Sequence, residues 1–190
     1  MDITVNILMT VATAATPLLI AAIGELVVER SGVLNLGVEG MMIMGAVGGF
    51  GAGYLTGSPW IGLLAAILLG ALFSLPFAFL TLTIATNQVA TGLSLTLLGL
   101  GLSGMIGTSF VGLPGERLPN LYIPFLTDVP VVGKLLFGQD PIFYLSIALT
   151  FGVAWFLFRT RTGLTLRSIG DSHASAHALG IRVVRYRYLA

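Results

Sequence analysis

The feature that most constrains this chain is a stretch from residue 40 to residue 115 that contains no charged side chain. One helical membrane crossing needs about 20 apolar residues, so a stretch of this length holds several crossings. Backbone in lipid must satisfy its own hydrogen bonds, which leaves only helices or a closed barrel. Barrel strands alternate apolar and polar residues, whereas residues 60–69 do not alternate. The stretch therefore predicts α-helices that cross a membrane.

Composition agrees with a membrane protein and disfavours a soluble one. Charged residues make up 9% of the chain, against roughly 25% in soluble domains, and the mean hydropathy is +0.98. The absence of cysteine excludes disulfides and thiolate metal sites. A net charge of +1 indicates no particular partner. From the apolar composition we expect contact with membrane lipid, and we expect none with nucleic acid.

We predict an all-α polytopic transmembrane bundle in which residues 1–190 form a single domain. Its expected spans are residues 3–23, 41–55, 60–85, 89–113 and 141–158, with a polar connection at 25–40. Small residues recur at every fourth position in three of these spans and predict close helix packing. The final residues, 185–190, are typical of the interfacial start of a further span, so we expect the chain to be the N-terminal part of a longer domain.

The distribution of basic residues predicts the orientation. Six of the nine Lys and Arg residues lie between Arg159 and Arg187, and basic loops face the cytoplasm. Counting back through five spans places the 114–140 loop outside, residues 25–30 inside and the N-terminus outside.

Four polar residues are candidates for a substrate path. Asn35 and Glu39 lie in a segment interrupted by glycines, which is unfavourable for a regular helix. The segment is either a broken stretch at membrane depth that lines a path or a cytoplasmic loop with solvated side chains, and the sequence does not decide between them. Asn87 and Gln88 also fit either a path or the cap of a turn, and the turn is favoured.

No catalytic or metal-binding set is evident. His173 and His177 have the i, i+4 spacing of two metal ligands, but further ligands are not evident, so two surface histidines are favoured. The chain lacks the Gly-x-x-x-x-Gly-Lys-Ser/Thr phosphate-binding pattern and therefore does not bind ATP through it. We expect neither enzymatic activity nor a cofactor.

The polar segment that follows the last span resembles a known family. Its pattern is similar to the cytoplasmic loop of inner-membrane permeases of ABC importers for branched-chain amino acids, ribose-type sugars and nucleosides. The matching residues are Gly163, Arg167, Gly170, Asp171, Ala174, Ala176, Gly180 and Ile181. The chain departs from the pattern at His173, where Pro is common, and at Ser175, where Ala is common. The resemblance implies that residues 159–182 form a coupling loop that docks on an ATPase.

Two upstream segments, 29–42 and 87–96, also resemble this family, and look closest to its nucleoside and simple-sugar branch. The resemblance implies a substrate path for a nucleoside or simple sugar in the cell inner membrane. It also implies three partners: an ATP-binding subunit, a second permease subunit in a heterodimer, and an extracytoplasmic substrate-binding protein. A secondary transporter or channel for a small polar solute is the alternative, with Glu25, Glu29 and Glu39 as its only candidate ionisable groups.

Overall fold

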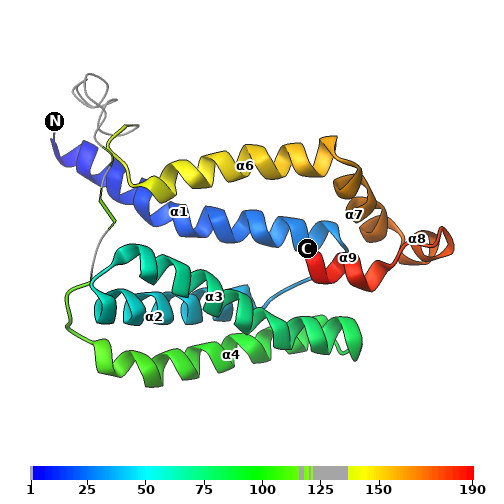
Figure 1. Cartoon of the computed structure of the whole chain (residues 1–190), viewed down its shortest axis with the longest axis horizontal. Coiled ribbons are helices and arrows are strands. Elements are labelled where there is room, and N and C mark those ends of the chain that lie inside the picture. The colour runs from blue at the N-terminus through cyan, green and yellow to red at the C-terminus, as the bar shows by residue number, and fades with distance from the viewer. Residues whose placement is uncertain (1, 116–117, 120, 122–136) are drawn as a thin grey trace.

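A computed structural model describes residues 2–115, 118–119, 121 and 137–190, and all regular structure in these ranges is helical (Figure 1). The long helices are α1 (Asp2–Arg30), α2 (Val38–Thr56), α3 (Pro59–Ala78), α4 (Gln88–Gly107) and α6 (Pro141–Arg159). A π-helical turn, η1 (Phe79–Thr83), continues α3, and a short 3₁₀ turn, η2 (Thr108–Phe110), follows α4. Three shorter helices end the chain: α7 (Arg161–Asp171), α8 (His173–Ala178) and α9 (Val183–Leu189). Most of the predicted 114–140 loop lies outside the described residues.

The prediction of a five-span all-α bundle is confirmed. In the described part of the chain, five helices are long and apolar enough to cross a membrane, and each overlaps one expected span: Ile7–Arg30, Val38–Thr56, Pro59–Thr83, Gln88–Phe110 and Pro141–Arg159. Their side chains are largely exposed, since apolar faces of a membrane protein meet lipid and need no covering by protein.

One boundary was predicted wrongly. Helix α1 does not end near residue 23 but runs on to Arg30, so Glu25 and Glu29 lie on the helix and not in a polar connection. Glutamate and arginine are good helix formers, and a basic residue in the last turn is favourable at the negative end of the helix dipole. The helix ends at Arg30 and is followed by a turn at Ser31 and Gly32, where Gly32 takes a φ of +79° that L side chains rarely adopt.

The long helices form two groups, as Figure 1 shows. In one group α2 packs against both α3 and α4, and in the other α1 packs against α6. Glycine makes the first group possible, because a Cβ on Gly62 would lie 2.7 Å from the carbonyl oxygen of Gly49. A Cβ on Gly99 would likewise lie 2.7 Å from the Cα of Gly40. The predicted use of small residues for close helix packing is therefore confirmed.

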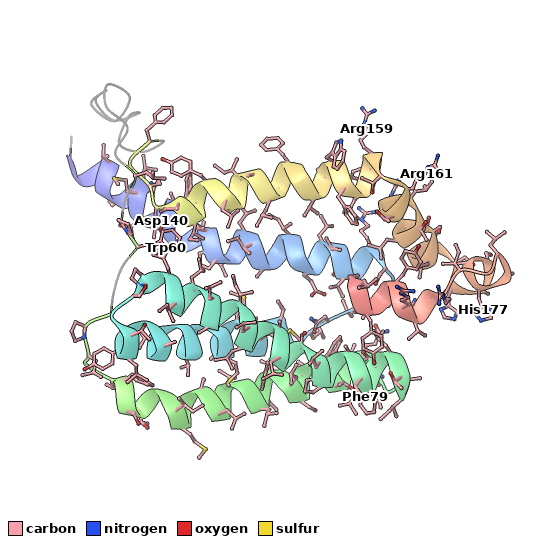
Figure 2. The ribbon with its side chains drawn as sticks, in the orientation of Figure 1. Trp60, Phe79, Asp140, Arg159, Arg161 and His177 are labelled. Atoms are coloured by element: carbon pink, nitrogen blue, oxygen red, sulfur yellow. The ribbon has the colours of Figure 1, made fainter. Side chains whose placement is uncertain are left out.

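The two ends of the bundle differ in chemistry. Arg159, Arg161 and His177 lie at one end and Trp60 and Asp140 at the other (Figure 2). The basic end is the one that the positive-inside bias assigns to the cytoplasm. We refer to it below as the basic end.

Thiol labelling tests this orientation, because the sequence contains no cysteine of its own. Pro114→Cys, next to Gly115, is expected to react with a membrane-impermeant maleimide in intact cells. Arg161→Cys is expected to react only after the cells are permeabilised. The cysteine-free parent is the control, and labelling of both positions from the same side would rule out the five-span topology.

Candidate functional site

A cavity of about 850 Å³ lies between the two helix groups. It is lined mainly by α1, α2 and α3, with contributions from η1, the start of α6 and α9. Most of its wall is apolar, and the polar or charged side chains in it are Thr13, Thr16, Glu25, Asn35, Ser74, Asp140, Arg187 and Tyr188. Sites for small molecules are typically 300–1,000 Å³, mostly apolar, with a few polar groups that fix orientation. This cavity has the size and lining of such a site.

The cavity is elongated along α1. Thr13 and Glu25 both line it and are separated by twelve residues of one helix, which corresponds to about 18 Å at 1.5 Å per residue. Asp140 lies at the Trp60 end of the bundle (Figure 2), where its carboxylate accepts a 2.9 Å hydrogen bond from the Phe143 amide and caps α6. The cavity therefore extends through much of the thickness that these helices span.

The 31–37 loop, which joins α1 to α2, forms part of the cavity wall. Glu25 Oε1 accepts a 3.0 Å hydrogen bond from the backbone N–H of Asn35. Asn35 Oδ1 in turn accepts a 3.0 Å hydrogen bond from the Gly37 amide, in the local turn that asparagine side chains favour. Asn35 lines the cavity but is only 8% exposed. The Asn35 side chain is therefore not solvated in this chain, and its role toward a substrate stays a prediction.

The other three residues predicted for the substrate path do not line this cavity. Glu39 is exposed in the first turn of α2, where its charge is favourable near the helix N-terminus. Asn87 caps α4, because its side chain accepts a 3.1 Å hydrogen bond from the Ala90 amide, so the favoured capping role is confirmed. Gln88 Oε1 accepts a 2.8 Å hydrogen bond from the Leu34 amide and so holds the 31–37 loop against α4.

Sequence reasoning missed several residues of the cavity. Thr13 and Thr16 are hydroxyl side chains inside an apolar span, three positions apart, and so lie on one face of α1. That spacing is a signal that could have identified them. Arg187 offers no comparable signal, since only the folding of α9 back onto the bundle brings it to the cavity.

Helices α7, α8 and α9, residues 161–189, fold into a compact segment at the basic end. Ile169, Ala176 and Val183 form its buried core, and Ala176 is only 2% exposed. Gly163 lies against Leu157 of α6, where a Cβ would come within 2.7 Å of the Leu157 Cα. Several of the family-like small residues are thus needed for packing inside this chain.

The outer surface of the 161–189 segment carries two of the family-like residues, Asp171 and Ala174. Asp171, Ala174 and His177 are exposed, as is Leu179 at the end of α8, with 80% of its surface exposed. Arg167 makes no ion pair with Asp171; its guanidinium instead lies 4.9 Å from the ring centroid of Phe158. Among the described residues no group of three His, Cys, Asp or Glu side chains converges on a metal position.

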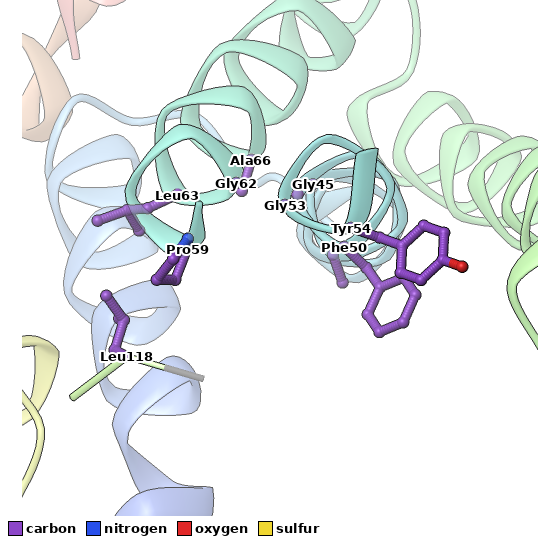
Figure 3. A pocket seen from close by; sticks show the side chains of 11 residues that line it. Gly45, Phe50, Gly53, Tyr54, Pro59, Gly62, Leu63, Ala66 and Leu118 are labelled. Atoms are coloured by element: carbon purple, nitrogen blue, oxygen red, sulfur yellow. The ribbon is translucent and has the colours of Figure 1, made fainter. Parts of the chain in front are cut away.

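A smaller cavity of about 320 Å³ lies between α2 and α3 at the Trp60 end (Figure 3). Its floor is formed by small residues of both helices, among them Gly53 and Gly62. Phe50 and Tyr54 lie on one side with their rings nearly parallel, at a centroid distance of 6.4 Å. Charged side chains are missing from its described lining, so the larger cavity is the better candidate for a polar solute.

Comparison with known proteins gives a consistent result. Residues 7–190 match the family model described as branched-chain amino acid transport system / permease component. A Haloferax volcanii protein provisionally named as a glucose ABC transporter permease is 38% identical over 100% of this chain. The guanosine ABC transporter permease protein NupQ of Bacillus subtilis is 38% identical, and the nucleoside ABC transporter permease protein NupC of Lactococcus lactis is 33% identical, each over 92% of this chain.

The chain spans 59% of the first two of these relatives and 58% of the third. No solved structure matches it.

Proposed function

The chain belongs to the family of branched-chain amino acid transport system permease components, and on this premise we propose that it works as the membrane-spanning permease subunit of an ABC importer. The family and the five apolar helices make it a multi-pass protein of the plasma membrane. The observation that carries the proposal is the cavity of about 850 Å³, which runs along α1 between the two helix groups. In this proposal the cavity is part of the path that the solute follows.

The proposed solute is a nucleoside or a simple sugar. The named relatives include permeases for guanosine and for nucleosides, and one provisionally named for glucose. Such solutes are neutral and carry several hydroxyl groups, which pair with carboxylate, amide and hydroxyl side chains. Glu25, Asn35 and Thr16 supply these types to a cavity whose remaining wall is mostly apolar.

The proposed partners follow from the two ends of the bundle. An ATP-binding subunit would dock at the basic end on residues 159–182, which carry the family-like coupling pattern. An extracytoplasmic substrate-binding protein would deliver the solute at the Trp60 end. A second permease subunit would complete the path as a heterodimer. The ATPase activity resides in the ATP-binding subunit, and the permease itself is not an enzyme.

A second candidate function, supported by Glu25, is that of an ion-coupled secondary transporter or channel. It is an ionisable side chain on a membrane span and it lines the cavity. Solute uptake driven by ATP in the absence of any ion gradient would support the importer. Uptake that requires a proton or sodium gradient and disappears in Glu25→Gln would instead support ion coupling.

Asn35→Leu tests the proposed path. The substitution removes the only predicted path residue that lines the cavity and leaves the Gly37 amide without its acceptor. We expect uptake of guanosine or glucose by the assembled transporter in proteoliposomes to fall about tenfold or more, since a lost buried hydrogen bond costs about 1–3 kcal/mol.

Asn35→Asp is the matched control, because its carboxylate still accepts from the Gly37 amide. It should retain the loop conformation and more of the uptake. Co-purification of the ATP-binding subunit should be normal in both variants. Unchanged uptake and unchanged apparent affinity in Asn35→Leu would contradict the proposal that the cavity is the path.

A further inference from the structure

The 31–37 loop touches the 161–189 segment on one side. Arg187 Nε donates a 3.0 Å hydrogen bond to the carbonyl oxygen of Ser31, across 156 positions of the sequence. Burial lowers the pKa of Arg187, but arginine's usual pKa is so high that the guanidinium stays charged. The contact is therefore a charge-assisted hydrogen bond to the loop backbone, which is stronger than a neutral one.

Helix α7 meets the loop at the same point. Gly170 lies so close to α1 that a Cβ there would overlap the carbonyl oxygen of Arg30 and come within 3.2 Å of the Gly32 amide. A Cβ on Gly32 would in turn lie 3.1 Å from both Arg187 Nη2 and the Gly170 Cα. Helices α7 and α9 and the first residues of the loop thus converge in a junction that leaves no room for a side chain at position 32 or 170.

On its other side the loop reaches the cavity. The backbone N–H of Asn35 donates a hydrogen bond to Glu25 Oε1. The side chains of Glu25 and Asn35 line the cavity wall. Helix α4 holds the same loop through Gln88 and through Thr96, whose hydroxyl donates a 2.9 Å hydrogen bond to the Leu36 carbonyl. The loop is therefore bound at successive backbone positions between Ser31 and Leu36.

We infer that Arg187 is a positioning residue for solute translocation: it ties the 161–189 segment to the 31–37 loop, so that motion of the segment moves Asn35 and Glu25 at the cavity. The inference rests on the proposed importer function. It assigns to α9 a role separate from docking, because Arg187 faces the interior of the chain and not the exposed surface of α8.

The test compares Arg187→Gln with Arg185→Gln in the assembled transporter, reconstituted with its ATP-binding subunit and binding protein. Both changes remove one positive charge from α9, but the Arg185 side chain is exposed and makes no hydrogen bond or ion pair with any described residue. We expect Arg187→Gln to lower the number of solute molecules taken up per ATP hydrolysed about tenfold, equivalent to about 1.4 kcal/mol. Co-purification of the ATP-binding subunit should remain normal, because Arg187 faces the interior of the chain.

Two further variants distinguish loss of the contact between Arg187 and Ser31 from a general loss of folding or assembly. Arg187→Lys keeps one charged donor and should give an intermediate uptake per ATP. The pair Ser31→Cys with Arg187→Cys should behave like Arg187→Gln until a short bifunctional thiol reagent bridges the two positions, and bridging should then restore coupling. Residues 1–190 contribute no other cysteine to the bridge.

Different results would overturn the proposed importer function and the proposed linkage through Arg187. Absence of ATP-driven uptake in the wild-type complex would overturn the proposed function and this inference with it. If wild type and Arg185→Gln transport normally and Arg187→Gln takes up as many molecules per ATP as they do, only the linkage is overturned. Complete bridging of the cysteine pair without any recovery would also overturn it.

Discussion

Gly99→Ala is expected to destabilise the protein, because a single methyl group at this position meets backbone atoms of α2. The added Cβ would lie 2.7 Å from the Gly40 Cα and 2.8 Å from the Gly40 carbonyl oxygen. Backbone atoms cannot rotate away as a side chain does, so α4 must shift relative to α2. Overpacking of this kind costs about 1–3 kcal/mol, and we expect a clearly lower midpoint in thermal unfolding of the purified protein.

Gly101→Ala is the matched control for this prediction. Gly101 lies two positions away on the same helix, and a Cβ there meets nothing within 4 Å. Alanine also has a higher helix propensity than glycine, by about 1 kcal/mol. Gly101→Ala should therefore be neutral or slightly stabilising, and equal unfolding midpoints for the two variants would show that α2 and α4 do not pack as described.

The second large effect is expected at Leu179, on the outer surface of the 161–189 segment. This side chain is 80% exposed at the end of α8, outside the membrane-spanning helices, and it belongs to residues 159–182, the proposed docking segment for the ATP-binding subunit. Burial of a leucine contributes about 1.5–3 kcal/mol. Leu179→Asp should therefore loosen the ATP-binding subunit roughly tenfold to a hundredfold, measured by co-purification and by solute-stimulated ATP hydrolysis.

Ala176→Trp is the informative comparison for Leu179→Asp. Ala176 is buried against Ile169 and Val183, so a tryptophan there should lower the stability of the 161–189 segment itself. Leu179→Asp should leave the thermal stability of the isolated permease unchanged, since its side chain is largely uncovered in this chain. If Leu179→Asp binds the ATPase as tightly as wild type, the exposed end of α8 is not the docking surface.

The spans could be predicted well from sequence, and their boundaries less well. Long apolar runs are a local property, and lipid forces each run to satisfy its hydrogen bonds as a helix. The end of α1 was misjudged because Glu25 looks like part of a polar connection. In the fold its side-chain carboxyl group accepts a hydrogen bond from the Asn35 backbone N–H ten residues later, and that partner satisfies a polar group on a membrane helix.

The candidate site was predicted only in part. Asn35 was identified because glycines interrupt an apolar segment around it, which is visible along the chain. Gln88 was also selected, but it holds the loop through the Leu34 amide instead of lining the cavity. Polarity in an apolar context indicates that a residue has a partner, but not whether that partner is a solute or the chain's own backbone.

Sequence by itself therefore determined the membrane location, the helical class, the number of spans and the family, because each depends on residue types in consecutive order. Tertiary structure decided which small residues face another helix, which face of α8 is exposed, and which polar side chains share the cavity. Those features depend on contacts between distant positions, such as Arg187 with Ser31 across 156 residues. Such a contact exists only after α9 has folded back onto the end of α1, and no local pattern of residues encodes it.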